Sequence, residues 1–173
     1  MVRNNLILLT MISLFSCKAG KDLSTVDAVN INKYAGCWYE IARLPNSFEK
    51  GLECITATYT VKDNGTIEVL NQGHLSKNIS KIKRIKGSAW VPNSTYPGRL
   101  KVRFFWPFSG DYYIVSLDKD YQYALVGSPS RKYLWVLSKN KELDHAIYSE
   151  LLEIANNKGF NVEKIIKVNQ TCK

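Results

Sequence analysis

Apolar and polar side chains alternate along the middle of the chain with the period of two that is typical of β-strands. Between about residues 36 and 138, Tyr, Val, Ile, Thr and Phe alternate with Lys, Glu, Asp and Asn in short runs. Turn sequences rich in Pro, Gly, Asn and Asp separate these runs. Asp63-Asn64-Gly65 is the clearest, because Asn and Gly tolerate a left-handed backbone. The pattern predicts strands at residues 37–44, 54–62, 66–74, 82–91, 98–106, 111–117, 121–128 and 133–138.

The period changes after residue 138 to one that predicts a single amphipathic helix. Asp144 can cap its start and Gly159 can end it, and the apolar positions on its face are Ile147, Leu151, Ile154 and Ala155. One helix cannot cover both faces of an open eight-stranded sheet. We therefore expect an all-β fold: a closed, antiparallel up-and-down barrel of eight strands with the C-terminal helix packed outside. A short further strand is expected around Phe160, Val162, Ile165 and Ile166.

The N-terminal residues are typical of a targeting segment. Arg3 precedes an apolar run at residues 6–15 that is too short to span a bilayer, so residues 1–16 are interpreted as a signal peptide. Leu14-Phe15-Ser16-Cys17 resembles a bacterial lipobox, which implies that Cys17 is acylated, with palmitate as the expected acyl group. Cleavage near Ser16 or Ala19 without lipidation is the alternative. Residues 17–30 would then be an N-terminal tether and residues 31–173 the folded domain.

The length and charge of the chain limit the number of domains and the kinds of partner it can have. With 173 residues and 45% apolar side chains, it fits one globular domain. The formal net charge is +9, and the cations are spread along the chain, which predicts a solvated basic face. For a protein of the cell envelope the expected partner of that face is an anionic lipid surface. A nucleic-acid partner is excluded because a secreted chain rarely meets one.

The cysteines indicate an oxidising compartment. If Cys17 is lipidated, one disulfide and one spare thiol are expected among Cys37, Cys54 and Cys172. The chain has no Cys-x-x-Cys spacing, and its two histidines, His74 and His145, are far apart in the sequence. No metal site and no cofactor are therefore expected.

Several segments resemble the signatures of the lipocalin family. Gly36-Cys37-Trp38-Tyr39-Glu40-Ile41-Ala42-Arg43 resembles the first signature, and residues 48–53 and 56–59 continue in the style of the bacterial members. Residues 120–126 resemble the second signature, and residues 133–138 resemble the strand that leads to the third. The resemblance covers about residues 31–170 and is strongest to the bacterial outer-membrane lipoprotein lipocalins and to apolipoprotein D. It implies a barrel with one closed end, where Gly36 and Trp38 form the floor.

The resemblance also implies roles for single residues. The third signature places an arginine over the signature Trp, and Lys139 stands at that position here. An ammonium can cover the Trp38 ring, but it cannot stack flat on the ring or hydrogen-bond to two backbone carbonyls as a guanidinium does. We therefore expect a weaker closure of the floor. The likeness to apolipoprotein D implies a disulfide between Cys54 and Cys172, and Cys37 would then be free. A catalytic thiol is known in the superfamily, but a Cys at the closed end is more often a small buried hydrophobe.

The family's register allows the inner face of the barrel to be assigned. With Trp38 inside, alternation places Glu40 and Ala42 inside as well. Phe48 and Phe108 are candidates for the rim of the entrance. The expected ligand-binding residues are Ala57, Tyr59, Asn71, Val102, Phe104, Tyr112 and Trp135. This apolar lining suits an aliphatic chain with its polar head near the mouth.

Together these expectations describe a lipocalin that stores or transports a lipophilic ligand, such as a fatty acid or lysophospholipid, in membrane maintenance or repair. The expected location is the cell envelope, with the protein lipid-anchored in the outer membrane and facing the periplasm, or else secreted. No enzymatic activity is expected, because Glu40 is the one inward carboxylate that can be placed and is interpreted as a hydrogen-bonded floor residue. The alternatives are an enzyme that uses a reactive Cys37 and a structural envelope protein with a filled barrel.

Overall fold

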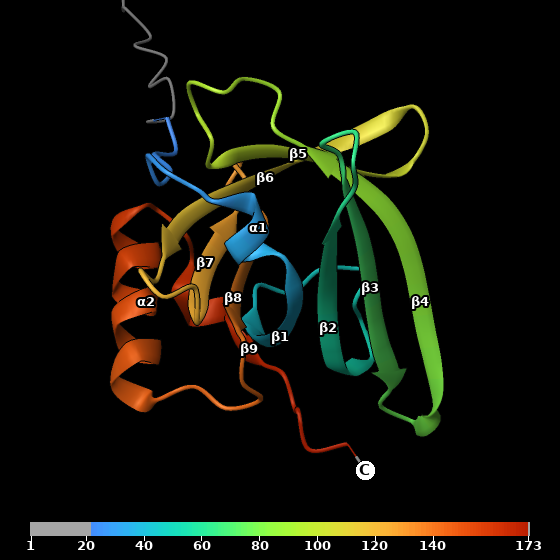
Figure 1. Ribbon diagram of the computed structural model, residues 1–173. Helices are drawn as coiled ribbons and strands as arrows, with labels where there is room; N and C mark the ends of the chain where they lie inside the picture. The colour runs from blue at the N-terminus through green and yellow to red at the C-terminus, as the bar shows by residue number, and fades with distance from the viewer. Residues whose placement is uncertain (1–21, 173) are drawn as a thin grey trace, which may run out of the picture.

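The computed structural model describes residues 22–172, which form a closed antiparallel β-barrel with one long helix packed outside it (Figure 1). The predicted fold is therefore confirmed. The predicted signal peptide and the predicted lipidation site, Cys17, lie outside the described residues. The strands are β1 Gly36–Arg43, β2 Leu52–Val61, β3 Ile67–Leu75, β4 Asn78–Trp90, β5 Arg99–Phe105, β6 Phe108–Leu117, β7 Tyr123–Gly127, β8 Leu134–Ser138 and β9 Ile166–Lys167. The helices are α1 Ile31–Tyr34, α2 His145–Asn157 and the 3₁₀ turn η1 Val162–Lys164.

Each strand from β1 to β8 pairs with the next along the chain, and β1 closes the barrel by pairing with both β2 and β8. This order follows from the short connections, since two antiparallel strands joined by a tight turn pair directly. The predicted turn at residues 63–65 joins β2 to β3, with Gly65 at a φ of +78° and Asn64 Oδ1 accepting from the Thr66 N–H. No helix among residues 22–172 is long and apolar enough to cross a membrane.

Strands β4 and β6 begin before the predicted starts at residues 82 and 111. Leu75 pairs with Asn78 and Phe105 pairs with Phe108, so both hairpins close over two-residue turns at the strand ends. Apolar alternation did not reveal these ends, because most side chains there face solvent on both sides of the strand. The strands therefore extend beyond the part of the barrel that has a packed interior.

Helix α2 has the predicted start, end and buried face. The Asp144 side chain accepts from the N–H groups of Ala146 and Ile147, and Gly159 follows the helix with a φ of +85°. Leu151 and Ala155 are fully buried against the outside of the barrel. The strand expected around residues 160–166 is wrong in part, because residues 162–164 form η1 and only Ile166–Lys167 pair with β1.

Apolar side chains gather in two clusters on opposite sides of the sheet. The first lies inside the barrel, around Trp38 and Ile114. The second lies between the barrel and α2, around Val136 and Leu151. Residues that precede the first strand belong to this packing: Leu23 is fully buried in the outer cluster, and the Val26 N–H donates to the Ile114 carbonyl.

Candidate functional site

A cavity of about 780 Å³ occupies the barrel and opens at one end. Its walls come from β1 to β6 and β8 and from the connections at the open end. The seven residues expected to bind a ligand all line it: Ala57, Tyr59, Asn71, Val102, Phe104, Tyr112 and Trp135. The interior is therefore not filled by its own side chains, and its volume is typical of small-molecule sites.

Three tyrosines meet at the inner end of the cavity, where Tyr59 and Tyr112 line it and Tyr34 lies behind them. The Tyr112 hydroxyl lies 2.7 Å from that of Tyr34 and 2.8 Å from that of Tyr59. Burial raises the pKa of all three phenols, and the neighbouring tyrosines raise that of Tyr112 further. All three therefore stay protonated at neutral pH and satisfy one another's hydrogen bonds. Tyr34 belongs to α1, so this contact fixes the short helix across the end of the barrel.

Trp38 forms the floor beneath these tyrosines. Its ring is fully buried, and its Nε1–H donates to the Tyr34 carbonyl at 2.7 Å. The Lys139 ammonium lies 4.2 Å from the centre of the Trp38 ring. Lys139 Nζ also lies 2.7 Å from the Ala35 carbonyl oxygen and 3.5 Å from that of Tyr34. The expectation that a lysine cannot reach two backbone carbonyls here is therefore wrong, because its long flexible stem brings Nζ between them.

Gly36 begins β1 at this floor with a φ of +95°, a conformation that side chains with a Cβ rarely adopt. Cys37 follows it and is exposed, which corrects the expectation of a small buried hydrophobe. Alternation is the reason: Trp38 points inward, so Cys37 points outward. Cys37 is also absent from the described residues that line the cavity.

A β-bulge changes the register of β1 halfway along the strand. Glu40 is opposite Leu137 and Ala42 is opposite Val136, so β1 has one extra residue between them. Beyond the bulge the inward and outward faces exchange. Ala42 lies in the cluster beneath α2, which makes the prediction that it faces the cavity wrong. Arg43 takes the inward place.

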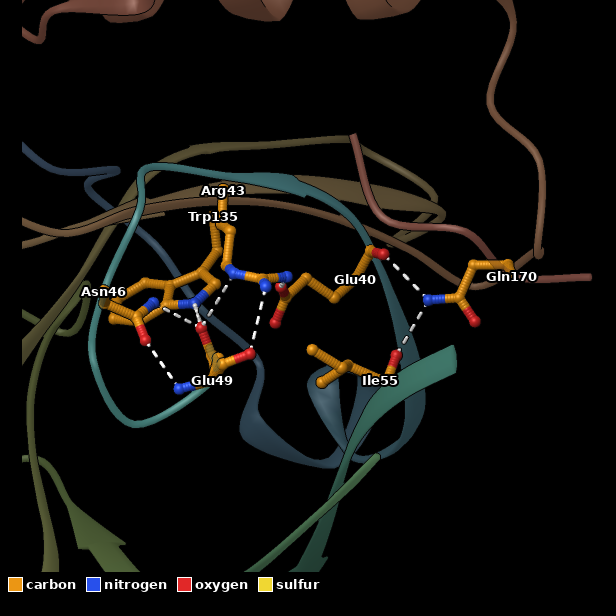
Figure 2. A network of polar contacts seen from close by, with 7 residues as sticks. All are labelled: Glu40, Arg43, Asn46, Glu49, Ile55, Trp135 and Gln170. Carbon is orange, nitrogen blue, oxygen red and sulfur yellow. Dashed lines mark hydrogen bonds and ion pairs between the residues drawn. The ribbon is translucent and has the colours of Figure 1, made fainter. Parts of the chain in front are cut away.

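Arg43 lies between two carboxylates in the wall of the barrel (Figure 2). Its Nη1 is 2.7 Å from Glu40 Oε1, and its Nη2 donates to the Glu49 backbone carbonyl at 3.1 Å. Its Nε is 3.5 Å from Glu49 Oε2. All three side chains are almost completely buried, and both carboxylates line the cavity. Arg43 and Glu49 are not predictable from the sequence pattern, because neither their spacing nor simple alternation places them inside.

Two further groups hold Glu49 in place. Trp135 Nε1 lies 3.3 Å from Glu49 Oε1 and 3.2 Å from Oε2, and the Asn46 side-chain amide donates to Oε2. The Glu49 N–H donates in turn to Asn46 Oδ1 at 2.9 Å. Because Glu49 belongs to the connection between β1 and β2, these contacts fasten that connection to the cavity wall.

Glu40 has an unusual protonation equilibrium. Burial raises its pKa from the ordinary value of 4.5 to about 8; the nearby Glu49 carboxylate adds to the increase and Arg43 opposes it. Glu40 therefore keeps its proton over most of the range in which an exposed glutamate has lost it. At neutral pH burial therefore favours the protonated form of Glu40, although Arg43 lies beside it.

The C-terminal tail completes the wall on the outside. The ladder between β1 and β2 ends where Tyr39 pairs with Thr56. Just beyond it, the Gln170 side-chain amide donates to the carbonyls of both Glu40 and Ile55, at 2.8 and 2.9 Å (Figure 2). A disulfide between Cys54 and Cys172, with Cα atoms 6.1 Å apart, attaches the tail to β2. The disulfide confirms the pairing implied by the resemblance, whereas the bridging amide of Gln170 was not predicted.

The mouth of the cavity combines aromatic and basic side chains. Phe48, Phe108 and Tyr133 line it, and the Phe48 ring centre lies 5.7 Å from that of Tyr133. Lys83 and Arg84 of β4 are exposed and line the same end. The two phenylalanines expected at the rim therefore lie there.

The barrel architecture and the similarity of the sequence to known proteins identify the same family. Residues 29–170 match the model of the lipocalin-like domain. The chain belongs to the lipocalin family. It is 39% identical over 150 residues to the outer membrane lipoprotein Blc of Citrobacter freundii, covering 87% of this chain and 84% of that lipocalin. It is 36% identical over 149 residues to apolipoprotein D of Bos taurus, covering 82% and 77% of the two chains.

Solved lipocalin-like structures have the same fold at lower identity. Insecticyanin from the tobacco hornworm Manduca sexta superposes with a TM-score of 0.70 at 22% identity, covering 88% of both chains. Lipocalin barrels of this size can enclose one small ligand. The cavity and its lining in this chain have that form.

Proposed function

We propose that this lipocalin binds a single acyl-chain lipid, such as a fatty acid or a lysophospholipid, and stores or transports it at the cell envelope. The observation that carries the proposal is the cavity of about 780 Å³ inside the barrel. Its predominantly apolar walls suit an acyl chain, because each buried methylene contributes about 0.8 kcal/mol without requiring directional contacts. Binding would be reversible and non-covalent.

The distribution of charge supports one orientation of the ligand. Arg43, buried in the wall, is occupied by Glu40 and Glu49. Lys83 and Arg84 at the mouth form no ion pair among residues 22–172. An anionic head group is therefore favoured at the mouth, and the acyl tail is favoured toward Tyr59 and the other floor tyrosines. A carboxylate near Glu49 would meet a buried like charge, which costs several kcal/mol.

One polar atom in the wall adds a second preference. Asn71 Oδ1 is buried, belongs to a cavity-lining residue and has no hydrogen-bond partner among the described residues. A buried polar atom without a partner costs about 1–3 kcal/mol, so a water molecule or a ligand hydroxyl is favoured beside it. Asn71 pairs with Ala57, which pairs with Trp38, so this polar position lies near the floor and away from a head group at the mouth.

The proposed location rests on the relatives and on the N-terminal motif. The relatives from Citrobacter freundii and Escherichia coli are named outer membrane lipoproteins. The lipobox-like segment ending at Cys17 supports the same anchoring for this chain. Membrane maintenance or repair is then the proposed use of a bound lysophospholipid or fatty acid. Detergent phase separation of the Cys17→Ser variant tests the anchor: the variant should leave the detergent phase, and retention there would contradict lipidation at Cys17.

Native mass spectrometry tests the carrier proposal. The protein is delipidated, mixed with a C16 fatty acid or with a lysophospholipid, and transferred intact to the gas phase. A complex of one ligand per chain is expected for the native protein. An Ala57→Trp variant, which fills part of the cavity, should form less of that complex while remaining folded by circular dichroism. A filled structural barrel predicts no complex with either protein, and an acyl adduct that survives denaturation would instead indicate covalent chemistry at Cys37.

A further inference from the structure

The turn between β5 and β6 carries a group of aromatic side chains that pack against little of the protein. Phe105, Trp106 and Phe108 are 69, 83 and 77% exposed. Phe105 pairs with Phe108, so Trp106 lies at the tip of a two-residue turn, which projects from the barrel in Figure 1. Leaving large aromatic surfaces in water is unfavourable, and a group of them marks an interaction surface.

This group lies at the entrance of the cavity. Phe105 and Phe108 belong to its lining, together with Phe48, which is 59% exposed. Five of the eight large apolar side chains that are most exposed among the described residues belong to this rim or its tip: Phe48, Phe105, Trp106, Phe108 and Tyr133. The apolar surface is thus concentrated where a ligand enters.

The unpaired charges on the residues that line the entrance are positive. Lys83 and Arg84 are exposed at the rim and have no ion-pair partner among residues 22–172. Asp111, the one half-buried carboxylate among the lining residues, lies 2.7 Å from Lys101 Nζ, and Glu49 is held by Arg43. The entrance therefore presents free cations next to exposed aromatic rings, without a free carboxylate to repel an anionic partner.

We infer that the mouth of the barrel docks directly onto an anionic lipid bilayer, with the β5–β6 turn inserted at the level of the head groups. Trp and Tyr favour that level because their rings are amphipathic, and each nearby cation is attracted to the negative surface. In this orientation an acyl chain passes between the bilayer and the cavity without crossing water. A second copy of the chain fits less well, because a projecting turn offers little of the roughly 800 Å² per partner that a stable interface needs.

Quenching of Trp106 fluorescence by brominated phospholipids tests the inserted position. The full chain carrying Cys17→Ser, which removes the proposed lipidation, is mixed with vesicles of phosphatidylcholine and phosphatidylglycerol, with and without bromine on the acyl chains. Brominated lipid should quench part of the emission, and Trp106→Phe, which keeps an aromatic ring at the tip, should remove most of that quenching. Equal quenching of the two proteins would place Trp106 outside the bilayer and overturn the inference.

Vesicle sedimentation tests the contribution of the surface. The double variant Trp106→Ser/Phe108→Ser should lower the vesicle partition coefficient about tenfold or more, as expected for two exposed aromatic rings removed from water. Lys83→Gln/Arg84→Gln should lower partitioning on anionic vesicles and leave that on neutral vesicles unchanged. The matched control is Tyr96→Ser, which removes an exposed aromatic ring from the connection between β4 and β5 and should have no effect.

The substitutions at the rim and at Tyr96 concern exposed side chains, so circular dichroism should show an unchanged fold. The inference is overturned if Trp106→Ser/Phe108→Ser partitions like the unsubstituted protein, or if Tyr96→Ser weakens partitioning equally. It is also overturned if size-exclusion chromatography shows a dimer that these substitutions dissociate while Trp106 stays protected from brominated lipid. That result would assign the rim to a second copy of the chain. Because no added ligand is involved, docking and the carrier proposal can fail independently.

Discussion

Arg43 Nη1 lies 2.7 Å from Glu40 Oε1 inside the barrel wall, although the two residues are three positions apart on one strand. In a regular strand such residues face opposite sides of the sheet. The bulge between Glu40 and Ala42 removes this conflict, because the extra residue brings Arg43 to the face that Glu40 already occupies. One inserted residue therefore creates both the buried ion cluster and the outward position of Ala42 beneath α2.

Arg43→Met should strongly destabilise the protein. The substitution leaves the Glu49 carboxylate buried without its cation, and breaking a buried pair in this way costs about 3–5 kcal/mol. Urea denaturation at pH 7 measures the change in the free energy of unfolding. Adding Glu49→Gln to the variant should recover part of the loss, because the uncompensated charge is then removed.

Lys62→Met is the control for Arg43→Met, because it breaks an ion pair at the surface instead of in the barrel wall. Lys62 Nζ lies 3.4 Å from Glu68 Oε2, and both side chains are well exposed. This surface pair should contribute less than about 1 kcal/mol. Equal losses from Lys62→Met and Arg43→Met would mean that the buried cluster is not an important source of stability.

The raised pKa of Glu40 predicts a dependence of stability on pH. Between the ordinary value of 4.5 and the folded value of about 8, the folded chain keeps a proton that the unfolded chain releases. The free energy of unfolding should therefore fall as the pH rises through this window, by up to about 1.4 kcal/mol per pH unit from this group. Glu40→Gln cannot ionise, so its stability relative to the native protein should increase from pH 5 to pH 8. A constant difference would show that Glu40 titrates in its ordinary range.

Removing the disulfide should destabilise the chain and release the tail. Cys54 and Cys172 are 118 positions apart, and closing a loop of that length contributes about 4–5 kcal/mol in the chain-entropy model. Thermal unfolding of Cys54→Ser/Cys172→Ser should show this loss, and hydrogen exchange should become faster in residues 166–172. Cys37→Ser, at an exposed free thiol, should change stability by less than about 0.5 kcal/mol.

Lys139 should act at the floor through both its charge and its hydrogen bonds. Lys139→Met removes the contact 4.2 Å from the Trp38 ring centre and the bond to the Ala35 carbonyl, at a cost of about 0.5–2 kcal/mol. Lys139→Arg should retain most of that stability, since a guanidinium can cover the ring and reach the same carbonyls. If Lys139→Arg and Lys139→Met unfold at the same temperature, the cation does not close the floor.

The fold was predictable because its main signals are local. Alternation along the strands, the hairpin at residues 63–65 and the Asp144 cap depend on neighbouring residues, and all are present in the structure. The cavity lining was predictable for the same reason, once the inward position of Trp38 set the register. Alternation carries that register along each strand until a bulge interrupts it.

The features that were missed depend on contacts between distant segments or on irregular backbone. Arg43 and Glu49 enter the wall through a bulge and a connection, and neither has a periodic signal. Gln170 bridges β1 and β2 from the far end of the chain. Tyr34 is fixed by hydrogen bonding to Tyr112, which is 78 positions away. No pattern within one segment could indicate these partners.

A titration with fatty acids of increasing chain length tests the central claim, that the barrel binds an acyl chain by apolar burial. Isothermal calorimetry on the delipidated protein should give 1:1 binding that strengthens about fourfold per added methylene, or about 0.8 kcal/mol, until the cavity is full. Ala57→Trp should end this increase at a shorter chain. The claim is contradicted if no fatty acid binds more tightly than about 100 μM, or if affinity does not depend on chain length.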